Sequence, residues 1–220
     1  MSLILSIETS TTNCSVSLSK QGETLVLKED NNQNYSHAES LHVFIDEVLK
    51  TAKIDKSQLD AIAVSKGPGS YTGLRIGVSA AKGLCYALDI PLISISTLEA
   101  LAHQAKINGG VIVSMLDARR LEVYSAIYDQ SFNIIREIKA QILDCQSFAS
   151  YLEKGNVVFI GNGVAKTKSL IQHANAVYLE DKLPSANEMS YLANEKYKKS
   201  DIENVAYFEP YYLKEFLIKK

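Results

Sequence analysis

The chain has 220 residues, of which 46% are hydrophobic and 22% are charged, as is usual for a globular protein with a sizeable core. Its formal net charge of −2 excludes the overall basic character of nucleic-acid-binding domains. The three cysteines are far apart and no C-x-x-C motif occurs, which argues against a disulfide framework and against a zinc or redox site of that type. No basic leader and no membrane-spanning run occurs, so we expect a cytoplasmic protein without a membrane partner.

The chain opens with three strand patterns and a helix. Residues 3–7, 14–19 and 24–27 combine apolar or alternating character with turn residues between them, and predict a β-meander. Ser36 and Glu39 have the spacing of a capping box. They precede apolar residues at helical spacing, which predicts a helix that ends near Ala52.

A second group of elements completes the first half. A buried strand at residues 59–64 leads into a Gly-Pro-Gly loop and a helix over residues 71–88. A strand at residues 92–95 precedes a second capping box, Ser96 with Glu99, which predicts a helix up to about residue 106. The first half therefore reads as a mixed sheet with helices packed against it.

The second half begins as the first does, with a meander after the Asn-Gly-Gly turn at residues 108–110. Its predicted strands are residues 111–116, 121–128, 132–138 and 157–160, and its predicted helices are 147–154, 165–173 and 185–198. We therefore expect an α/β fold with two lobes, residues 1–106 and 107–220. Each lobe would be a mixed β-sheet opened by a three-strand meander and flanked by helices, and the aromatic tail could pack back on the first lobe.

Residues 66–77, KGPGSYTGLRIG, form a rigid turn that runs into a helix. Gly67 and Gly69 allow positive φ, Pro68 fixes the turn, and a following hydroxyl can cap the helix. Free amides at the helix start could hold an anion, but this is no Walker loop, because no G-K-[ST] follows the glycines. A tight strand-to-helix turn is at least as good an interpretation.

A stripe of small residues follows along this helix. Gly73, Gly77 and Ala81 fall four residues apart, so one face of the helix has almost no side chain. Such a face lets another element pack closely, either the sheet of the same domain or a second subunit. The spacing alone favours internal packing.

Two other segments could contribute to a nucleotide site. Glu8, Thr9 and Ser10 end the first strand, where a carboxylate can organise a metal-bound phosphate. Gly161 and Gly163 lie in a strand-to-helix G-x-G turn. Both signals are weak, since a polar strand end that caps a turn explains the first and a lone G-x-G occurs in many turns.

The histidines argue against a metal centre. His37 and His42 are five residues apart, which places them about 140° apart around a helix of 3.6 residues per turn. No i, i+4 histidine pair, H-E-x-x-H motif or G-x-S-x-G elbow occurs. We therefore expect no metal site and no catalytic residue.

Four segments together resemble the TsaB (YeaZ) family of the actin-like, sugar-kinase-like superfamily. They are residues 66–77, STLEAL at 96–101, DARRLEVY at 117–124 and PYYL at 210–213. The resemblance covers most of the chain and is most specific within residues 3–22 and 59–106. The chain departs from the family pattern in having Glu8 where Asp is commoner and Lys214 where Arg is usual.

The resemblance implies two actin-like (ribonuclease H-like) lobes and a non-catalytic scaffold or activating subunit. Such a subunit pairs with a TsaD-like catalytic subunit and acts with a TsaE-like ATPase. The assembly transfers a threonylcarbamoyl group to N6 of adenosine 37 in tRNAs that read codons starting with A. Alone the chain would form a homodimer, tRNA would be engaged indirectly through the complex, and no cofactor would be required, although ATP or ADP could bind at a subunit interface.

The resemblance also changes the interpretation of the glycine stripe, which becomes a partner interface. A large residue at Gly77 would then prevent pairing while the monomer stays folded. The expected interface residues are Tyr71, Gly73, Leu74, Arg75, Gly77, Val78, Ala81 and Lys82. The alternative is an independent actin-like kinase or transferase that holds Mg-ATP with Glu8 and the Gly161 turn, with Asp117 a candidate base by its position after a strand.

Overall fold

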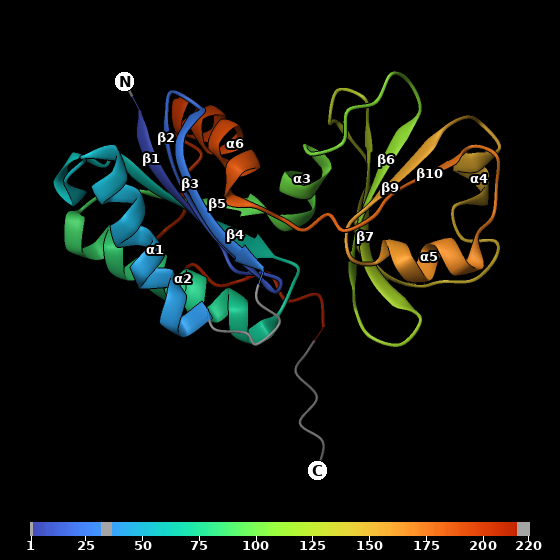
Figure 1. Ribbon diagram of the computed structural model, residues 1–220, viewed down its shortest axis with the longest axis horizontal. Helices are drawn as coiled ribbons and strands as arrows, with labels where there is room; N and C mark the ends of the chain where they lie inside the picture. Colours follow the sequence, from blue (N-terminus) through green and yellow to red (C-terminus); the bar gives the residue numbers. More distant parts are fainter. Residues whose placement is uncertain (1, 32–36, 215–220) are drawn as a thin grey trace, which may run out of the picture. The chain divides into compact units, whose positions relative to one another are not determined.

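The computed structural model describes residues 2–31 and 37–214 (Figure 1). These residues form two compact units. Unit 1 contains the described residues up to Ala100 together with Pro184–Tyr211, and unit 2 contains Leu101–Leu183 and the described residues after Tyr211. This division differs from the expected lobes, because the chain returns to unit 1 after residue 183. No helix in the described part of the chain is long and apolar enough to cross a membrane.

Unit 1 is built on a five-stranded mixed sheet of order β3-β2-β1-β4-β5. Its strands are β1 (Leu3–Glu8), β2 (Asn13–Lys20), β3 (Glu23–Asn31), β4 (Ala61–Gly67) and β5 (Leu92–Ser96). The first three form the predicted antiparallel meander, and β4 and β5 extend the sheet parallel to β1. Side chains of β1 alternate between two buried cores, with Leu5 and Ile7 on one face and Ile4 on the other.

Helices cover both faces of this sheet. Figure 1 shows α1 (His37–Ala52) and α2 (Tyr71–Leu88) over one face and α6 (Ala186–Lys198) over the other. A 3-10 turn, η1 (Lys56–Gln58), precedes β4. The expected cap at Ser36 lies outside the described residues.

The second predicted cap begins α3 (Thr97–Ala102), where the Glu99 N–H donates to Ser96 Oγ at 3.5 Å. This helix ends four residues before the predicted end at residue 106.

The packing of α6 explains why the chain returns to unit 1. Ala186, Met189 and Ala193 are fully buried against the β-sheet core that contains Ile4. Ser17 Oγ donates to the Ala186 carbonyl at 2.7 Å, which fixes the start of the helix on β2. The helix was expected with the second lobe because it follows that lobe in the sequence, but its apolar face is complementary to the first sheet.

Unit 2 repeats the topology of unit 1. Its sheet has the order β10-β9-β6-β7-β8, with a meander followed by two parallel strands. Its elements are β6 (Val111–Asp117), β7 (Glu122–Asp129), β8 (Ile134–Ile142), α4 (Ala149–Leu152), β9 (Val157–Ile160), α5 (Val164–Leu170) and β10 (Ala176–Leu179). The predicted duplication is therefore confirmed. Sequence analysis missed β10, because this four-residue edge strand is only partly buried and lacks a clear alternation.

The segment that follows α6 lies along unit 1. The Glu203 N–H donates to the Leu92 carbonyl at 2.8 Å, so this segment pairs briefly with the edge of β5. The Lys82 ammonium donates to the carbonyls of Ala206 at 3.1 Å and Phe208 at 3.0 Å. The Tyr211 N–H donates to the Lys66 carbonyl at 2.7 Å, beside the Gly-Pro-Gly loop.

Candidate functional site

The turn before α2 uses its polar groups internally. The Gly67–Pro68 bond is cis. The Ser70 N–H donates to the Ser10 carbonyl at 2.7 Å, and the Gly73 N–H donates to Ser70 Oγ at 3.3 Å. Two donors that could have held an anion are therefore already satisfied, one by Ser10 in the turn after β1 and one by the Ser70 cap.

The small-residue stripe of α2 faces inward. A methyl group at Gly73 would overlap the Thr9 carbonyl oxygen, and one at Gly77 would overlap the Thr9 hydroxyl. Thr9 Oγ1 also donates to the Gly73 carbonyl at 2.7 Å. The stripe thus lets α2 approach the end of β1 within unit 1, which is the internal packing that spacing alone favoured.

This packing corrects the expected interface. Five of its eight residues are buried inside unit 1 and do not lie on its surface; they are Gly73, Leu74, Gly77, Val78 and Ala81. Tyr71, Arg75 and Lys82 remain on the outer side of α2, and Lys82 is engaged by the segment after α6. A large residue at Gly77 has no room beside the Thr9 hydroxyl, so we now expect such a substitution to destabilise unit 1 as well as any pairing.

Glu8 does not fit a metal-bound phosphate. Its side chain is buried, and Oε1 accepts hydrogen bonds from the Ser10 N–H at 2.6 Å and from Ser65 Oγ at 3.0 Å. Oε2 has no hydrogen-bond partner among the described residues. Burial raises the pKa of this carboxyl despite the hydrogen bonds from Ser10 and Ser65, because the charged form is poorly solvated. Glu8 stabilises the turn after β1 by accepting the Ser10 N–H. Thr9 and Ser10 are buried as well.

The raised pKa of Glu8 predicts a pH dependence of stability. Between the ordinary pKa of the unfolded carboxyl and the higher folded pKa, the folded state binds more protons, so stability falls as pH rises through that window. Glu8→Gln keeps an acceptor at Oε1 and removes this titration. Urea unfolding at pH 5 and pH 8 should show a smaller decline for the variant than for the parent chain. Equal declines would contradict the assignment.

The glycines of the G-x-G turn of unit 2 also allow close packing within the unit. Gly161 has φ +116°, and a methyl group there would overlap the Met115 carbonyl of β6. Asn162 Oδ1 accepts the Asp117 N–H at 2.8 Å, and Gly163 lies against Val123 and Met115. The turn therefore joins β9 to β6, and the space beside the α-carbons of Gly161 and Gly163 is filled by residues of β6 and β7.

The β6–β7 turn contains two consecutive arginines and is held by an ion pair between Asp117 and Lys166. Asp117 Oδ2 pairs with Lys166 Nζ at 2.9 Å, and Oδ1 accepts the Arg119 N–H at 2.6 Å. Lys166 Nζ also donates to the carbonyls of Arg120 at 2.6 Å and Glu122 at 3.2 Å. Arg119 and Arg120 have φ of +70° and +51°, a left-handed conformation that costs about 1 kcal/mol for each. Asp117 thus organises a turn and is not placed as a free base.

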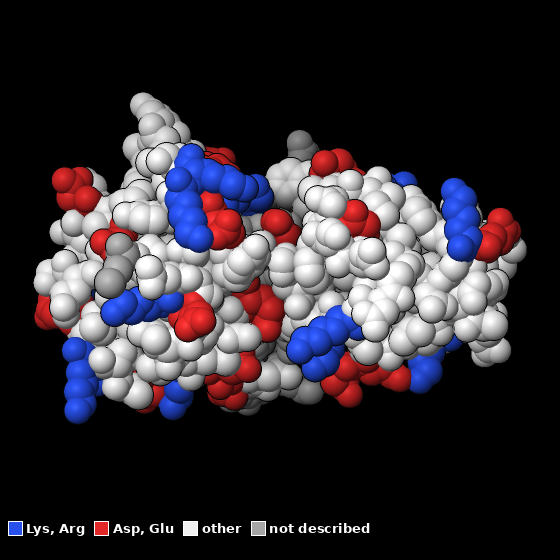
Figure 2. Space-filling model, turned by 90° about the horizontal axis from the view of Figure 1, so that it is seen from above, with Lys and Arg blue, Asp and Glu red and all other residues white. Residues whose placement is uncertain are grey.

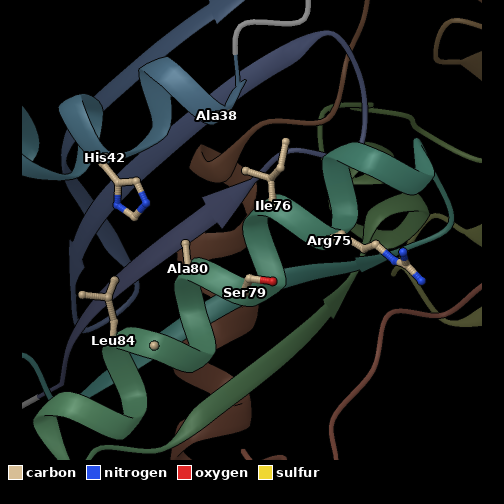
Figure 3. Close-up of a pocket in the computed structure, with 8 residues that line it drawn as sticks. Ala38, His42, Arg75, Ile76, Ser79, Ala80 and Leu84 are labelled. Carbon is tan, nitrogen blue, oxygen red and sulfur yellow. The ribbon is translucent and has the colours of Figure 1, made fainter.

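The surface of unit 1 carries a groove of about 570 Å³ between α1 and α2 (Figure 3). Ile76, Ala80 and Leu84 project from α2 toward α1, and His42 projects from α1 into the same space. Ala38, Arg75, Ser79 and Gly83 complete the lining. Sequence analysis missed this groove, although Ile76, Ala80 and Leu84 recur every four residues beside the glycine stripe. The glycine stripe is the stronger sequence signal, and the apolar stripe next to it was therefore not recognised.

One basic residue, Arg75, is part of the lining of the groove. The Arg75 guanidinium lies over the Tyr71 ring, with its central carbon 4.1 Å from the ring centroid. Figure 3 shows the Arg75 side chain pointing away from α1. Figure 2 shows the charged side chains on one face of the molecule. Acidic and basic side chains are interspersed there, with no continuous patch of either sign.

The histidines of α1 lie in different environments, as their spacing predicted. His37 is buried, with Nε2 2.6 Å from the Thr11 carbonyl oxygen, whereas His42 lines the groove. Within residues 2–31 and 37–214, no three His, Cys, Asp or Glu residues form a group that could hold a metal ion.

Comparison with known proteins matches this architecture. Residues 31–219 match the model of the family described as TsaD, tRNA N6-adenosine threonylcarbamoyltransferase. The chain is 31% identical to the tRNA threonylcarbamoyladenosine biosynthesis protein TsaB of Haemophilus influenzae, over 96% of this chain and 93% of that protein. The chain belongs to the TsaB (YeaZ) family. The TsaB of Escherichia coli is 30% identical over 96% of this chain and 94% of its own length.

Solved structures share the fold of this chain. YeaZ from Pseudomonas aeruginosa superimposes with a TM-score of 0.83 at 28% identity, over 97% of this chain and 100% of that one. The ethanolamine utilization protein EutJ from Carboxydothermus hydrogenoformans has a TM-score of 0.50 at 10% identity, over 86% of this chain and 89% of that one, which shows likeness of fold alone.

Proposed function

We propose that this chain acts in tRNA threonylcarbamoyladenosine biosynthesis as a non-catalytic subunit that pairs with a TsaD-like catalytic subunit through the α1–α2 groove. The observation that carries the proposal is the open apolar groove between α1 and α2. The two turns that could have held a nucleotide, after β1 and at Gly161, are instead occupied by contacts within the protein. The relatives bear the name of this biosynthesis, and the matching family model bears the name of the transferase.

The state of the loops supports a non-catalytic role. The Glu8 carboxyl is buried in the turn after β1, and the Gly161 turn is filled by the Met115 carbonyl. Asp117 is held in an ion pair with Lys166. The three residues on which an independent Mg-ATP-dependent kinase or transferase would depend are thus all engaged in structure, which disfavours that alternative.

The chemistry of the groove supports a protein partner. Its lining combines aliphatic side chains from α2 with Arg75, whose guanidinium lies over the Tyr71 ring. Tyr and Arg are over-represented among residues that dominate binding energy, and an apolar groove between two helices accepts the apolar face of another helix. We assign the same surface to the homodimer expected of the chain alone.

The remaining partners follow from the same assembly. The TsaE-like ATPase and tRNA would join through the complex, and any ATP or ADP would lie at a subunit interface, since the loops of this chain offer no cradle. The chain itself requires no cofactor in this role.

Size-exclusion chromatography with light scattering tests the pairing. We expect the chain alone to run as a homodimer and to form a one-to-one heterodimer when mixed with the TsaD-like protein of the same cell. The heterodimer should modify tRNA when the TsaE-like ATPase and the threonylcarbamoyl adenylate, the donor of the group, are supplied, and the chain alone should not turn over ATP. ATP turnover by the isolated chain without any heterodimer would instead support the independent enzyme.

A further inference from the structure

The turn between β6 and β7 has a conformation that its sequence does not favour. Arg119 and Arg120 are consecutive left-handed residues, at φ of +70° and +51°, where Gly, Asn or Asp are the usual residues. Both side chains are exposed, and Leu121 beside them is 53% exposed. Strain of this kind persists where the surrounding structure enforces it and is concentrated at functional positions.

Contacts of Lys166 and Asp117 hold the backbone of this turn in its left-handed conformation. Lys166 of α5 donates to the Arg120 carbonyl at 2.6 Å and pairs with Asp117 at 2.9 Å, while Asp117 accepts the Arg119 N–H at 2.6 Å. The Lys166 side chain is 15% exposed, so this anchor is largely shielded from water. The backbone of the turn is therefore held against unit 2, and its two guanidinium groups are left at the surface.

The nearby carboxylates do not neutralise these arginines. Asp117 pairs with Lys166, and Glu122 pairs with Lys214. No ion pair or hydrogen bond joins either guanidinium to another described residue. The turn thus has a local excess of two positive charges on a chain whose formal net charge is −2.

The geometry points to a phosphate backbone as the ligand of this turn. We propose that Arg119 and Arg120 contact backbone phosphates of the tRNA while the chain is in its complex. Guanidinium groups present a planar fork of donors that matches phosphate oxygens, and a rigid, convex turn can approach a nucleic-acid backbone without a pocket. The inference rests on the proposed function, which supplies the RNA, and it replaces the expectation of purely indirect contact with tRNA.

The test uses the complex of the full chain with the TsaD-like subunit and an unmodified tRNA transcript that reads codons starting with A. Fluorescence anisotropy gives the Kd between 50 and 200 mM KCl. The double variant Arg119→Gln/Arg120→Gln should raise the Kd by about 5- to 20-fold and lower the slope of log Kd against log salt by about 1 to 2. The control is Lys139→Gln/Lys154→Gln, which removes two exposed charges elsewhere in unit 2 and should leave both quantities unchanged.

The outcomes separate this inference from the proposed function. An intact complex whose variant binds tRNA with unchanged Kd and salt slope overturns the inference alone. Loss of the heterodimer in the variant would identify an acidic protein surface as the ligand and would overturn it too. If the parent chain forms no complex, the proposed function fails and the inference fails with it. The variant Lys166→Met, which releases the turn but keeps both arginines, should weaken binding by a smaller factor.

Discussion

Replacing Gly73 by Ala is expected to lower the free energy of unfolding by about 3 kcal/mol, a large effect for one methyl group. The added Cβ would overlap the carbonyl oxygen of Thr9, which is backbone at the end of β1 and cannot rotate away. Relief would require α2 to move off the sheet and expose core residues such as Val78. Urea unfolding of the parent and the variant gives the difference from the shift in midpoint.

Gly83 on the same helix is the matched control. It is exposed, and a Cβ there would meet nothing within 4 Å. Gly83→Ala should therefore raise stability by about 0.5 to 1 kcal/mol, because Ala restricts the unfolded chain and favours helix. Opposite signs for the same substitution ten residues apart would establish that α2 packs on β1 through Gly73. Similar small effects at both positions would contradict that packing.

Ser79→Arg is expected to weaken pairing with the TsaD-like subunit by at least about 100-fold, or about 2.8 kcal/mol. Ser79 lies on the groove and is exposed, so the long side chain can be accommodated in the free subunit. In the heterodimer it would occupy the apolar groove and place an unpaired charge in a desolvated interface. Titration calorimetry with the partner gives the Kd directly.

The control for this prediction introduces the same charge on the other side of the sheet. Asn187 is exposed on α6, which packs on the opposite face from α1 and α2 (Figure 1). Asn187→Arg should pair with normal affinity, and both variants should melt within a few degrees of the parent chain, since exposed substitutions change stability little. A Ser79→Arg chain that binds as tightly as the parent would remove the groove from the interface.

The topology of each unit could be predicted because its signals are local. Alternating segments separated by turns marked both meanders, and the helix over residues 71–88 was predicted with the bounds that the structure shows. The position of α6 could not be predicted in this way. Nothing within residues 186–198 says which of two similar sheets its buried face will cover, because that choice depends on complementarity with residues such as Ile4, distant in sequence.

The candidate site shows the same limit. The stripe of Gly73 and Gly77 was recognised as a close-packing surface, and its spacing favoured internal packing, but the family resemblance moved the prediction to a partner interface. The groove residues Ile76, Ala80 and Leu84 lay one position away in the helical pattern and were overlooked. The place of Glu8 at a strand end left two interpretations open, a phosphate ligand or a cap for the turn. Its burial depends on Ser65 of the neighbouring strand and on the turn through Ser10, which are distant or irregular features that no local pattern shows.

The return of the chain to its first sheet has a consequence for synthesis on the ribosome. The face that α6 covers stays open until residues 186–198 emerge, because its contacts span about 170 positions, as in the bond from Ser17 to Ala186. Unit 2, in contrast, forms its sheet from one continuous stretch, residues 101–183. The sheet of unit 1 is therefore synthesised first but completed last, after the sheet of unit 2. Long-range closure of this kind slows folding and leaves an apolar face uncovered in the interval, when a nascent chain is most open to chaperones.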